Sequence, residues 1–186
     1  MRKVKYSVAN SLDGFIARAD GAVDWLFMDG TDYGMTEFFK SIDAVLMGRK
    51  TYEFAQSHSP KKRSVSKKAK SGSSASGSGM RSYVFSRTMK RAPDEDVQII
   101  SENAGEFIRR LKSEAGKDIW LMGGGSLARS LFAEGVVDEI SLAVHPVLLG
   151  SGIALFPDIG KQINLELIES KSHANGVVQV AYRVRN

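Results

Sequence analysis

The sequence predicts one α/β domain, a three-layer α/β/α arrangement whose mostly parallel sheet ends in an antiparallel C-terminal hairpin. Short apolar runs alternate with amphipathic segments through the first two thirds of the chain, as strands alternate with helices in such domains. Asn175 and Gly176 separate two strand-like segments near the C-terminus, which is a strong hairpin signal. A length of 186 residues, 42% of them hydrophobic, fits a single domain over residues 1–186 with a sizeable core.

The N-terminal part of the chain supplies two strands and two short helices. Residues 3–11 alternate between apolar and polar side chains, and residues 44–47 form a short buried run, so both predict strands. Thr31 or Asp32 can cap a short helix between them. The second strand ends at residues 48–51, from which a helix is expected to start.

The later elements follow the same alternation. We expect strands over residues 82–88 and 97–101, an amphipathic helix over residues 104–115, and a strand region over residues 137–149 that is broken by Pro146. The closing antiparallel pair is expected over residues 164–172 and 177–185.

Residues 118–135 predict a strand, a glycine turn and a helix in direct succession. Gly123, Gly124 and Gly125 follow the apolar run without a spacer, and Ser126 can cap the helix that ends before Gly135. Residues without a Cβ let backbone N–H groups approach a phosphate closely, and the start of a helix adds partial positive charge. The element therefore indicates either an anion site or a tight turn without a ligand.

Three polar, glycine-rich or basic turns follow predicted strands, at residues 48–51, 86–88 and 123–126. In a parallel sheet the carboxyl ends of the strands share one edge, and ligands bind outside that edge. The three turns are therefore expected to converge on one binding site.

The net charge of +5 comes from one segment. Residues 57–79 are rich in serine, glycine and lysine, hold six lysines and arginines and no acid, and leave the remainder of the chain at −1. Such a composition predicts a mobile basic loop at about residues 57–80. Because this segment lacks interleaved aromatic residues, nucleic-acid binding is not favoured.

Several function classes are disfavoured by composition. The chain has no cysteine, and its three histidines (His58, His145 and His173) lack metal-ligand spacing, so no metal site is expected. No apolar run is long enough for a signal peptide or a membrane span, so we expect a cytoplasmic protein.

These motifs resemble a known family. Residues 47–53 (MGRKTYE), 84–88 (VFSRT) and 120–125 (WLMGGG) resemble the three cofactor-contacting segments of the dihydrofolate reductase fold. Residues 7–17 (SVANSLDGFIA) and 137–152 (VDEISLAVHPVLLGSG) are more similar to the reductase domain of bacterial riboflavin biosynthesis, the RibD C-terminal type. The resemblance implies a stand-alone reductase of this fold that uses NADPH to reduce a small molecule.

The resemblance also implies a set of cofactor-binding residues. Arg49 and Lys50 can clamp the 2′-phosphate that distinguishes NADPH from NADH, unless they form only a solvated helix start. Ser86 and Arg87 can add a second wall to that phosphate site. The remaining implied residues are Gly48, Thr51, Gly123, Gly124, Gly125, Ser126 and Leu127 around the pyrophosphate, and Ala9 and Ile16 beside the nicotinamide or simply in the core.

On the substrate side, the resemblance points to two acids and one tryptophan. Asp13 could orient the substrate or relay a proton, or form an Asx-type turn before Gly14. Asp32 matches the spacing of the substrate-binding acid of dihydrofolate reductase, or acts as a helix cap. Trp25 could cover the substrate pocket or belong to the core.

The sequence departs from the riboflavin reductase at two places, which leaves several functions open. Phe15 stands where a basic residue usually follows Ser-Leu-Asp-Gly, and no counterpart of the arginine used for the ribose phosphate is visible. The expected function is therefore hydride transfer to a heterocyclic, pterin-like or pyrimidine-like substrate, resembling 5-amino-6-(5-phosphoribosylamino)uracil reductase. The alternatives are a dihydrofolate reductase and a nucleotide-binding protein without catalysis.

The strand region at residues 137–149 also bears on assembly. Ile140, Leu142 and Val144 share one face of it by strand alternation. Either this face belongs to a central strand, or it contributes to a homodimer with twofold symmetry, as the resemblance implies.

Overall fold

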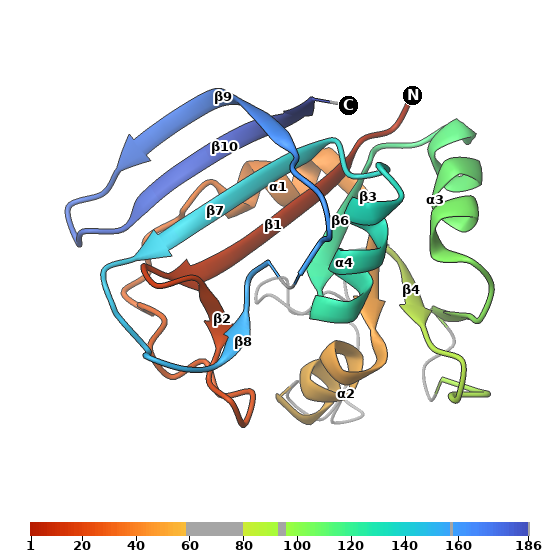
Figure 1. Ribbon diagram of the computed structural model, residues 1–186, viewed down its shortest axis with the longest axis horizontal. Helices are drawn as coiled ribbons and strands as arrows, with labels where there is room; N and C mark the ends of the chain where they lie inside the picture. Colours follow the sequence, from red (N-terminus) through yellow and green to blue (C-terminus); the bar gives the residue numbers. More distant parts are fainter. Residues whose placement is uncertain (59–79, 93–95, 157, 186) are drawn as a thin grey trace, which may run out of the picture.

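The computed structural model describes residues 1–58, 80–92, 96–156 and 158–185. The predicted basic loop falls almost entirely outside these residues. The described chain forms a mixed eight-stranded sheet in the order β5-β4-β3-β6-β1-β7-β10-β9, together with a small two-stranded sheet of β2 and β8 (Figure 1). The predicted α/β fold with a mostly parallel sheet and a C-terminal antiparallel pair is confirmed.

The parallel part of the sheet spans six strands. The strands of the main sheet are β1 (Val4–Ser11), β3 (Ile42–Gly48), β4 (Arg81–Phe85), β5 (Val97–Ile100), β6 (Asp118–Gly123), β7 (Glu139–His145), β9 (Asn164–Ser172) and β10 (Val178–Arg185). The small sheet joins β2 (Phe15–Ala17) to β8 (Ile153–Ala154). All neighbours from β5 to β7 pair in parallel, whereas β10 pairs antiparallel with β7 and with β9.

Helices cover both faces of the sheet. The helices are α1 (Met35–Ser41), α2 (Arg49–His58), α3 (Ala104–Ser113) and α4 (Gly125–Ala133). Apolar side chains of α3 and α4, including Phe107, Ile108 and Leu131, pack into one core cluster with β1, β6 and β7. Phe38 of α1 and Tyr52 of α2 belong to a second cluster with Trp120 of β6. The sheet therefore separates two apolar layers, as the three-layer prediction requires.

Several predicted boundaries differ from the structure. The strand expected over residues 82–88 ends at Phe85 as β4. The expected strand region 137–149 contains the shorter strand β7, which ends at His145 because Pro146 has no N–H to continue the ladder. The predicted cap at Ser126 is wrong. Helix α4 starts one residue before that serine, and its N-cap residue is Gly124, which has no side chain to cap it.

The alternation of β7 divides its side chains between the two faces. Ile140 is 2% exposed and belongs to the cluster on the α3 and α4 side, with Leu142 packed against it. Ser141, Ala143 and His145 consequently face the α1 side. Both edges of β7 are paired, to β1 and to β10, so this strand lies inside the sheet.

Candidate cofactor and substrate site

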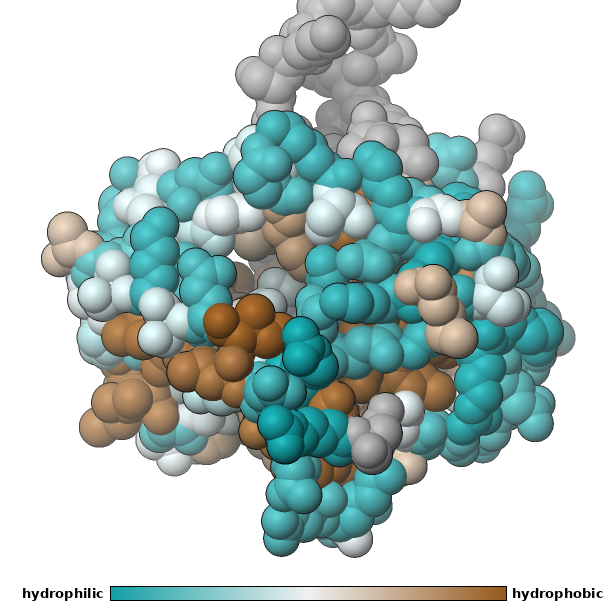
Figure 2. Space-filling view, turned by 90° about the horizontal axis from the view of Figure 1, so that it is seen from above, coloured by the Kyte–Doolittle hydropathy of each residue, from teal (hydrophilic) through white to brown (hydrophobic). Residues whose placement is uncertain are grey.

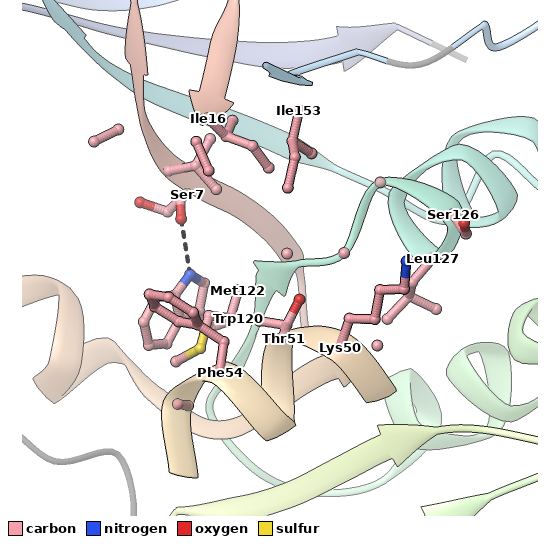
Figure 3. A pocket seen from close by; sticks show the side chains of 18 of the residues that line it. Ser7, Ile16, Lys50, Thr51, Phe54, Trp120, Met122, Ser126, Leu127 and Ile153 are labelled. Carbon is pink, nitrogen blue, oxygen red and sulfur yellow. Dashed lines mark hydrogen bonds between the residues drawn. The ribbon is translucent and has the colours of Figure 1, made fainter. Parts of the chain in front are cut away.

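A single large cavity of about 1920 Å³ lies at the carboxyl edge of the parallel strands and continues along the α1 face of the sheet. Its lining includes all three turns that the sequence singled out, after β3, β4 and β6. The close-up in Figure 3 shows residues of two of these turns surrounding the same space. The predicted convergence of the turns is therefore present in the fold.

Gly48 and Gly124 bring the ends of β3 and β6 into direct backbone contact. A Cβ on Gly124 would lie 3.2 Å from the nitrogen and 3.3 Å from the Cα of Gly48, and 3.3 Å from Oγ1 of Thr51. Gly124 also has φ +101, a conformation that L side chains rarely adopt. Both features explain why glycine stands at this position.

Two helices begin immediately after this contact. Helix α2 starts at Arg49, next to Gly48, and helix α4 starts at Gly125, next to Gly124. Each N-terminus carries backbone N–H groups without partners inside its helix and the positive end of a helix dipole. Two such ends beside one cavity form an environment that suits an anion such as a phosphate.

Cationic side chains surround the same place. The side chain of Lys50 extends toward Ser126 and Leu127 at the start of α4 (Figure 3), and within the described ranges no ion pair is recorded for it. Arg49 pairs with Glu53 one turn along α2, with 2.9 Å between Nη1 and Oε1. Arg87 is exposed beside the cavity. Among the described residues, the charges of Lys50 and Arg87 are therefore more available to a bound anion than that of Arg49.

Ser86 shapes the turn that carries Arg87. Its Oγ accepts hydrogen bonds from the backbone N–H groups of Thr88 (3.3 Å) and Met89 (3.0 Å), and its own N–H donates to the carbonyl of Ile100 (2.9 Å). These bonds hold the end of β4 against β5 and keep the turn at the rim of the cavity.

The structure brings together every residue that the resemblance assigned to the cofactor. Lining residues are Ala9, Ile16, Gly48, Arg49, Lys50, Thr51, Ser86, Arg87, Gly123, Gly124, Gly125, Ser126 and Leu127. These residues come from separate segments of the chain and line one cavity.

Asp13 lies outside the lining of this cavity. Its exposed carboxylate accepts hydrogen bonds from Oγ of Ser11 (2.6 Å) and from the N–H groups of Leu149 (3.1 Å) and Gly150 (2.7 Å). The bond from Ser11 is the largest of the effects that lower the pKa of Asp13. These contacts tie the loop after β1 to the loop after β7. The predicted Asx-type turn is wrong, because the N–H of Phe15 donates to Oγ of Ser11 (2.9 Å) and not to Asp13.

Asp32 and Trp25 also lie outside the cavity lining. Oδ1 of Asp32 accepts from the N–H groups of Met35 (2.7 Å) and Thr36 (3.3 Å), and the bond from the Thr36 side chain is the main cause of its lowered pKa. The N-cap residue of α1 is Gly34, so the predicted cap at Thr31 or Asp32 is wrong, although Asp32 still bonds the first N–H groups of the helix. Trp25 is 7% exposed and packs edge-on against His145, with 5.3 Å between ring centroids. Trp25 thus supports the wall of the cavity from behind.

The sequence alone did not identify the residues on the sheet face of the cavity. Ser7, Ser141 and His145 line it from β1 and β7, opposite Phe27 and Tyr33. Their signal was the alternation within β7, where small and polar residues take every second position between apolar ones. The alternation alone did not show which face of β7 lines a cavity, because that depends on the strands on either side of it.

Two further classes of site receive no support in the described part of the chain. No group of three or more histidines, cysteines or acids that could hold a metal ion occurs among these residues. No helix there is long and apolar enough to cross a membrane.

Comparison with protein families identifies the class of this fold and site. The chain belongs to the RibD C-terminal domain family, whose sequence model matches residues 2–179. Two Bacillus subtilis proteins of uncharacterized function are similar along nearly their whole length. YyaP is 38% identical over 181 residues, covering 97% of this chain and 94% of that protein, and YwjB is 36% identical over 178 residues, covering 95% of each.

Solved structures share the fold. A Shewanella sp. PV-4 protein, provisionally assigned to riboflavin biosynthesis, has a TM-score of 0.82 at 23% identity, with both chains covered completely. A Corynebacterium diphtheriae pyrimidine reductase-like protein has a TM-score of 0.67 at 18% identity, covering 100% of this chain and 92% of that one. Enterococcus faecalis dihydrofolate reductase, complexed with NADP(H), has a TM-score of 0.67 at 14% identity, covering 99% and 97%. The predicted family and fold are confirmed.

Proposed function

We propose that this protein is an NADPH-dependent reductase that transfers hydride to a small planar heterocycle. One observation carries the proposal: two helix N-termini meet at the Gly48–Gly124 contact, on the carboxyl edge of a parallel sheet, beside Lys50, which forms no ion pair with the described residues. A dinucleotide places its phosphates at such an edge. NADPH would supply the hydride, and the protein would supply binding, orientation and exclusion of water.

The residues at this edge fit the phosphates of NADPH. The N–H groups at Gly123, Gly124 and Gly125, with the hydroxyl of Thr51, would hold the pyrophosphate near Ser126 and Leu127. Arg49, Lys50, Ser86 and Arg87 would surround the 2′-phosphate, the group that NADH lacks. The contact at Gly124 supports this fit, because a larger residue there would occupy the space between the two helix starts.

Other residues would position the reacting ring. Ala9, Ile16, Met122 and Trp120 all line the cavity, and Nε1 of Trp120 donates to the carbonyl of Ser7 at 2.9 Å. These side chains would form a dry wall at the nicotinamide. Asp13 would act on the substrate indirectly, by holding the loop at Leu149 and Gly150 through its two backbone contacts.

The contacts of Asp32 weigh against a dihydrofolate reductase. That function would need a buried acid facing the substrate, whereas Asp32 is exposed and bonded to the backbone at the start of α1. Its lowered pKa keeps it ionised at neutral pH, so it is a poor proton donor there. The protein is accordingly proposed to act on a different heterocycle.

We further propose that the enzyme works as a cytoplasmic homodimer. The dimer surface proposed here lies on β9 and β10 rather than on β7, whose Ile140 is buried. Leu165, Leu167 and Val178, which are 42%, 55% and 42% exposed, lie on the α3 and α4 side of the sheet beyond those helices. Figure 2 shows apolar side chains gathered at the surface on the side where the β9–β10 pair lies.

Titration with NADPH and NADH, followed by turnover, tests the proposed function. NADPH should quench tryptophan fluorescence saturably, because Trp120 lines the cavity. NADPH oxidation should then accelerate with a heterocyclic substrate from a panel of pterins and pyrimidines. Tight NADPH binding without turnover across the panel would favour a nucleotide-binding protein, and no NADPH binding would refute the proposal.

A further inference from the structure

The α1 face of the sheet forms a flat floor of the cavity, beyond the turns that are proposed to bind the cofactor. Strand register places Ser7 opposite Ser141 and Ser141 opposite Ala181. The next row places Ala9 opposite Ala143 and Ala143 opposite Gln179. All six residues line the cavity. Because neighbouring strands lie about 4.8 Å apart and most of these side chains are small, the floor leaves room for a flat molecule.

A roof over this floor comes from the segment before α1. Phe27 and Tyr33 line the cavity and lie 5.2 and 6.1 Å from the His145 ring, centroid to centroid. Nε2 of Gln179 donates to the carbonyl of Tyr33 at 2.7 Å, and Nδ2 of Asn175 donates to its hydroxyl at 2.6 Å. These bonds fasten the roof to the floor strand β10 and to the turn before it. The aromatic roof and flat floor together form a slot, called here the sheet-face arm.

Two hydroxyl groups stand side by side at one end of the arm. Ser7 and Ser141 are partly buried register partners that line the cavity. Within the described ranges, no hydrogen bond is recorded for either hydroxyl; the recorded bond at Ser7 uses its carbonyl. Each hydroxyl can donate and accept, so together they match the adjacent C=O and N–H of a cyclic amide.

A buried imidazole stands at the other end. His145 is 2% exposed, lines the cavity and lies four residues beyond Ser141, about 13 Å along the strand. Nδ1 lies 3.1 Å from the carbonyl of Ala143, and a carbonyl only accepts, so this nitrogen carries a hydrogen. No hydrogen bond is recorded for Nε2 among the described residues. It is therefore free to contact a molecule in the arm.

We propose that the sheet-face arm binds an uncharged, planar two-ring heterocycle, with Ser7 and Ser141 contacting a cyclic-amide edge and His145 contacting the far ring. This inference rests on the proposed reductase function, because the arm joins the cofactor half of the same cavity. The floor between β1 and β10 carries no full charge. Glu169 and Lys171, of opposite sign, lie beyond it on β9. An uncharged ring system suits this environment better than a phosphorylated one.

The test uses lumazine, a planar two-ring heterocycle with a cyclic-amide edge, as the probe. Isothermal titration calorimetry measures its binding to the full-length protein at saturating NADPH. Ser141→Ala and His145→Phe should each weaken lumazine binding roughly three- to tenfold, the usual worth of one hydrogen bond. Ser170→Ala is the matched control, because Ser170 is exposed on β9 and lies outside the cavity lining. Melting temperatures and NADPH affinities should match the wild type in all three variants.

Failure of this inference can be distinguished from failure of the proposed function. Absence of saturable lumazine binding to the NADPH-loaded protein, or wild-type affinity in both Ser141→Ala and His145→Phe, overturns the assignment of the arm. Failure to bind NADPH would instead contradict the reductase function, and the lumazine titration with the free protein then tests the arm by itself.

Discussion

Replacing Gly124 by alanine should destabilise the fold and damage the cofactor site together. The new Cβ would lie 3.2 Å from the backbone nitrogen of Gly48, and neither that nitrogen nor its Cα can rotate away as a side chain could. Crowding of this kind typically costs about 1–3 kcal/mol. The φ of +101 adds the cost of a positive-φ backbone conformation that L side chains rarely adopt, about 1–3 kcal/mol.

Gly123→Ala separates the two contributions. Gly123 has φ +150, but a Cβ there would meet nothing within 4 Å, so this variant carries the backbone cost without the crowding. Urea unfolding should place Gly124→Ala below Gly123→Ala by about 1–3 kcal/mol, the crowding cost alone. Equal stabilities for the two variants would refute the reasoning about the Gly48 contact. Gly125→Ala offers a third comparison, because Gly125 is the first residue of α4 and lacks a positive φ. The Gly125→Ala variant should keep the wild-type free energy of unfolding but bind NADPH more weakly.

Three further predictions follow from charges and surfaces. Arg49→Ala and Lys50→Met should each lower the affinity for NADPH by about tenfold or more, which is the usual contribution of a hydrogen bond to a charged group. Both should affect NADH less, as parallel titrations would show, and equal losses for the two cofactors would exclude contact with the 2′-phosphate. Because the pKa of Asp13 is lowered, its ionised form stabilises the fold at neutral pH, and this contribution is lost as pH falls through that lowered value. Asp13→Asn should therefore reduce stability at neutral pH but not in strong acid, and a difference that persists unchanged into acid would contradict this. Leu167→Lys should dissociate the proposed homodimer in sedimentation at micromolar concentration, whereas Gln98→Lys, which is exposed on β5 at the opposite edge of the sheet, should not. A wild-type protein that sediments as a monomer would rule the dimer out.

The part of the cavity that is proposed to hold the cofactor could be located from sequence because its residues fall in short consecutive runs. Gly48, Arg49, Lys50 and Thr51 occupy one turn, and the glycine triplet occupies another. Only the parallel sense of the strands was needed to bring these turns to one edge, and alternating strands and helices specify that sense. The fold class and the location of the cavity followed from the same pattern.

The substrate half could not be predicted in the same way. Ser7 and Ser141 are distant in the chain and meet only through the register of β1 and β7, which no local pattern specifies. The positions of Asp13 and Asp32 were suggested by spacing, but side-chain direction decides whether a carboxylate faces a cavity or the backbone. In both cases short hydrogen bonds to nearby N–H groups favour the backbone.

Strand β6 links the two halves of the cavity. Its carboxyl end leads through Gly123 and Gly124 into α4, where the phosphates of a dinucleotide are proposed to bind. Three residues before Gly123, the Trp120 side chain packs between Phe38 and Phe39 and donates through Nε1 to the carbonyl of Ser7. The same strand thus fixes the glycine turn and the first residue of the sheet-face floor relative to each other. Hydride transfer depends on close alignment of the two reacting rings. A rigid, buried strand that holds both sites meets that requirement without a moving part.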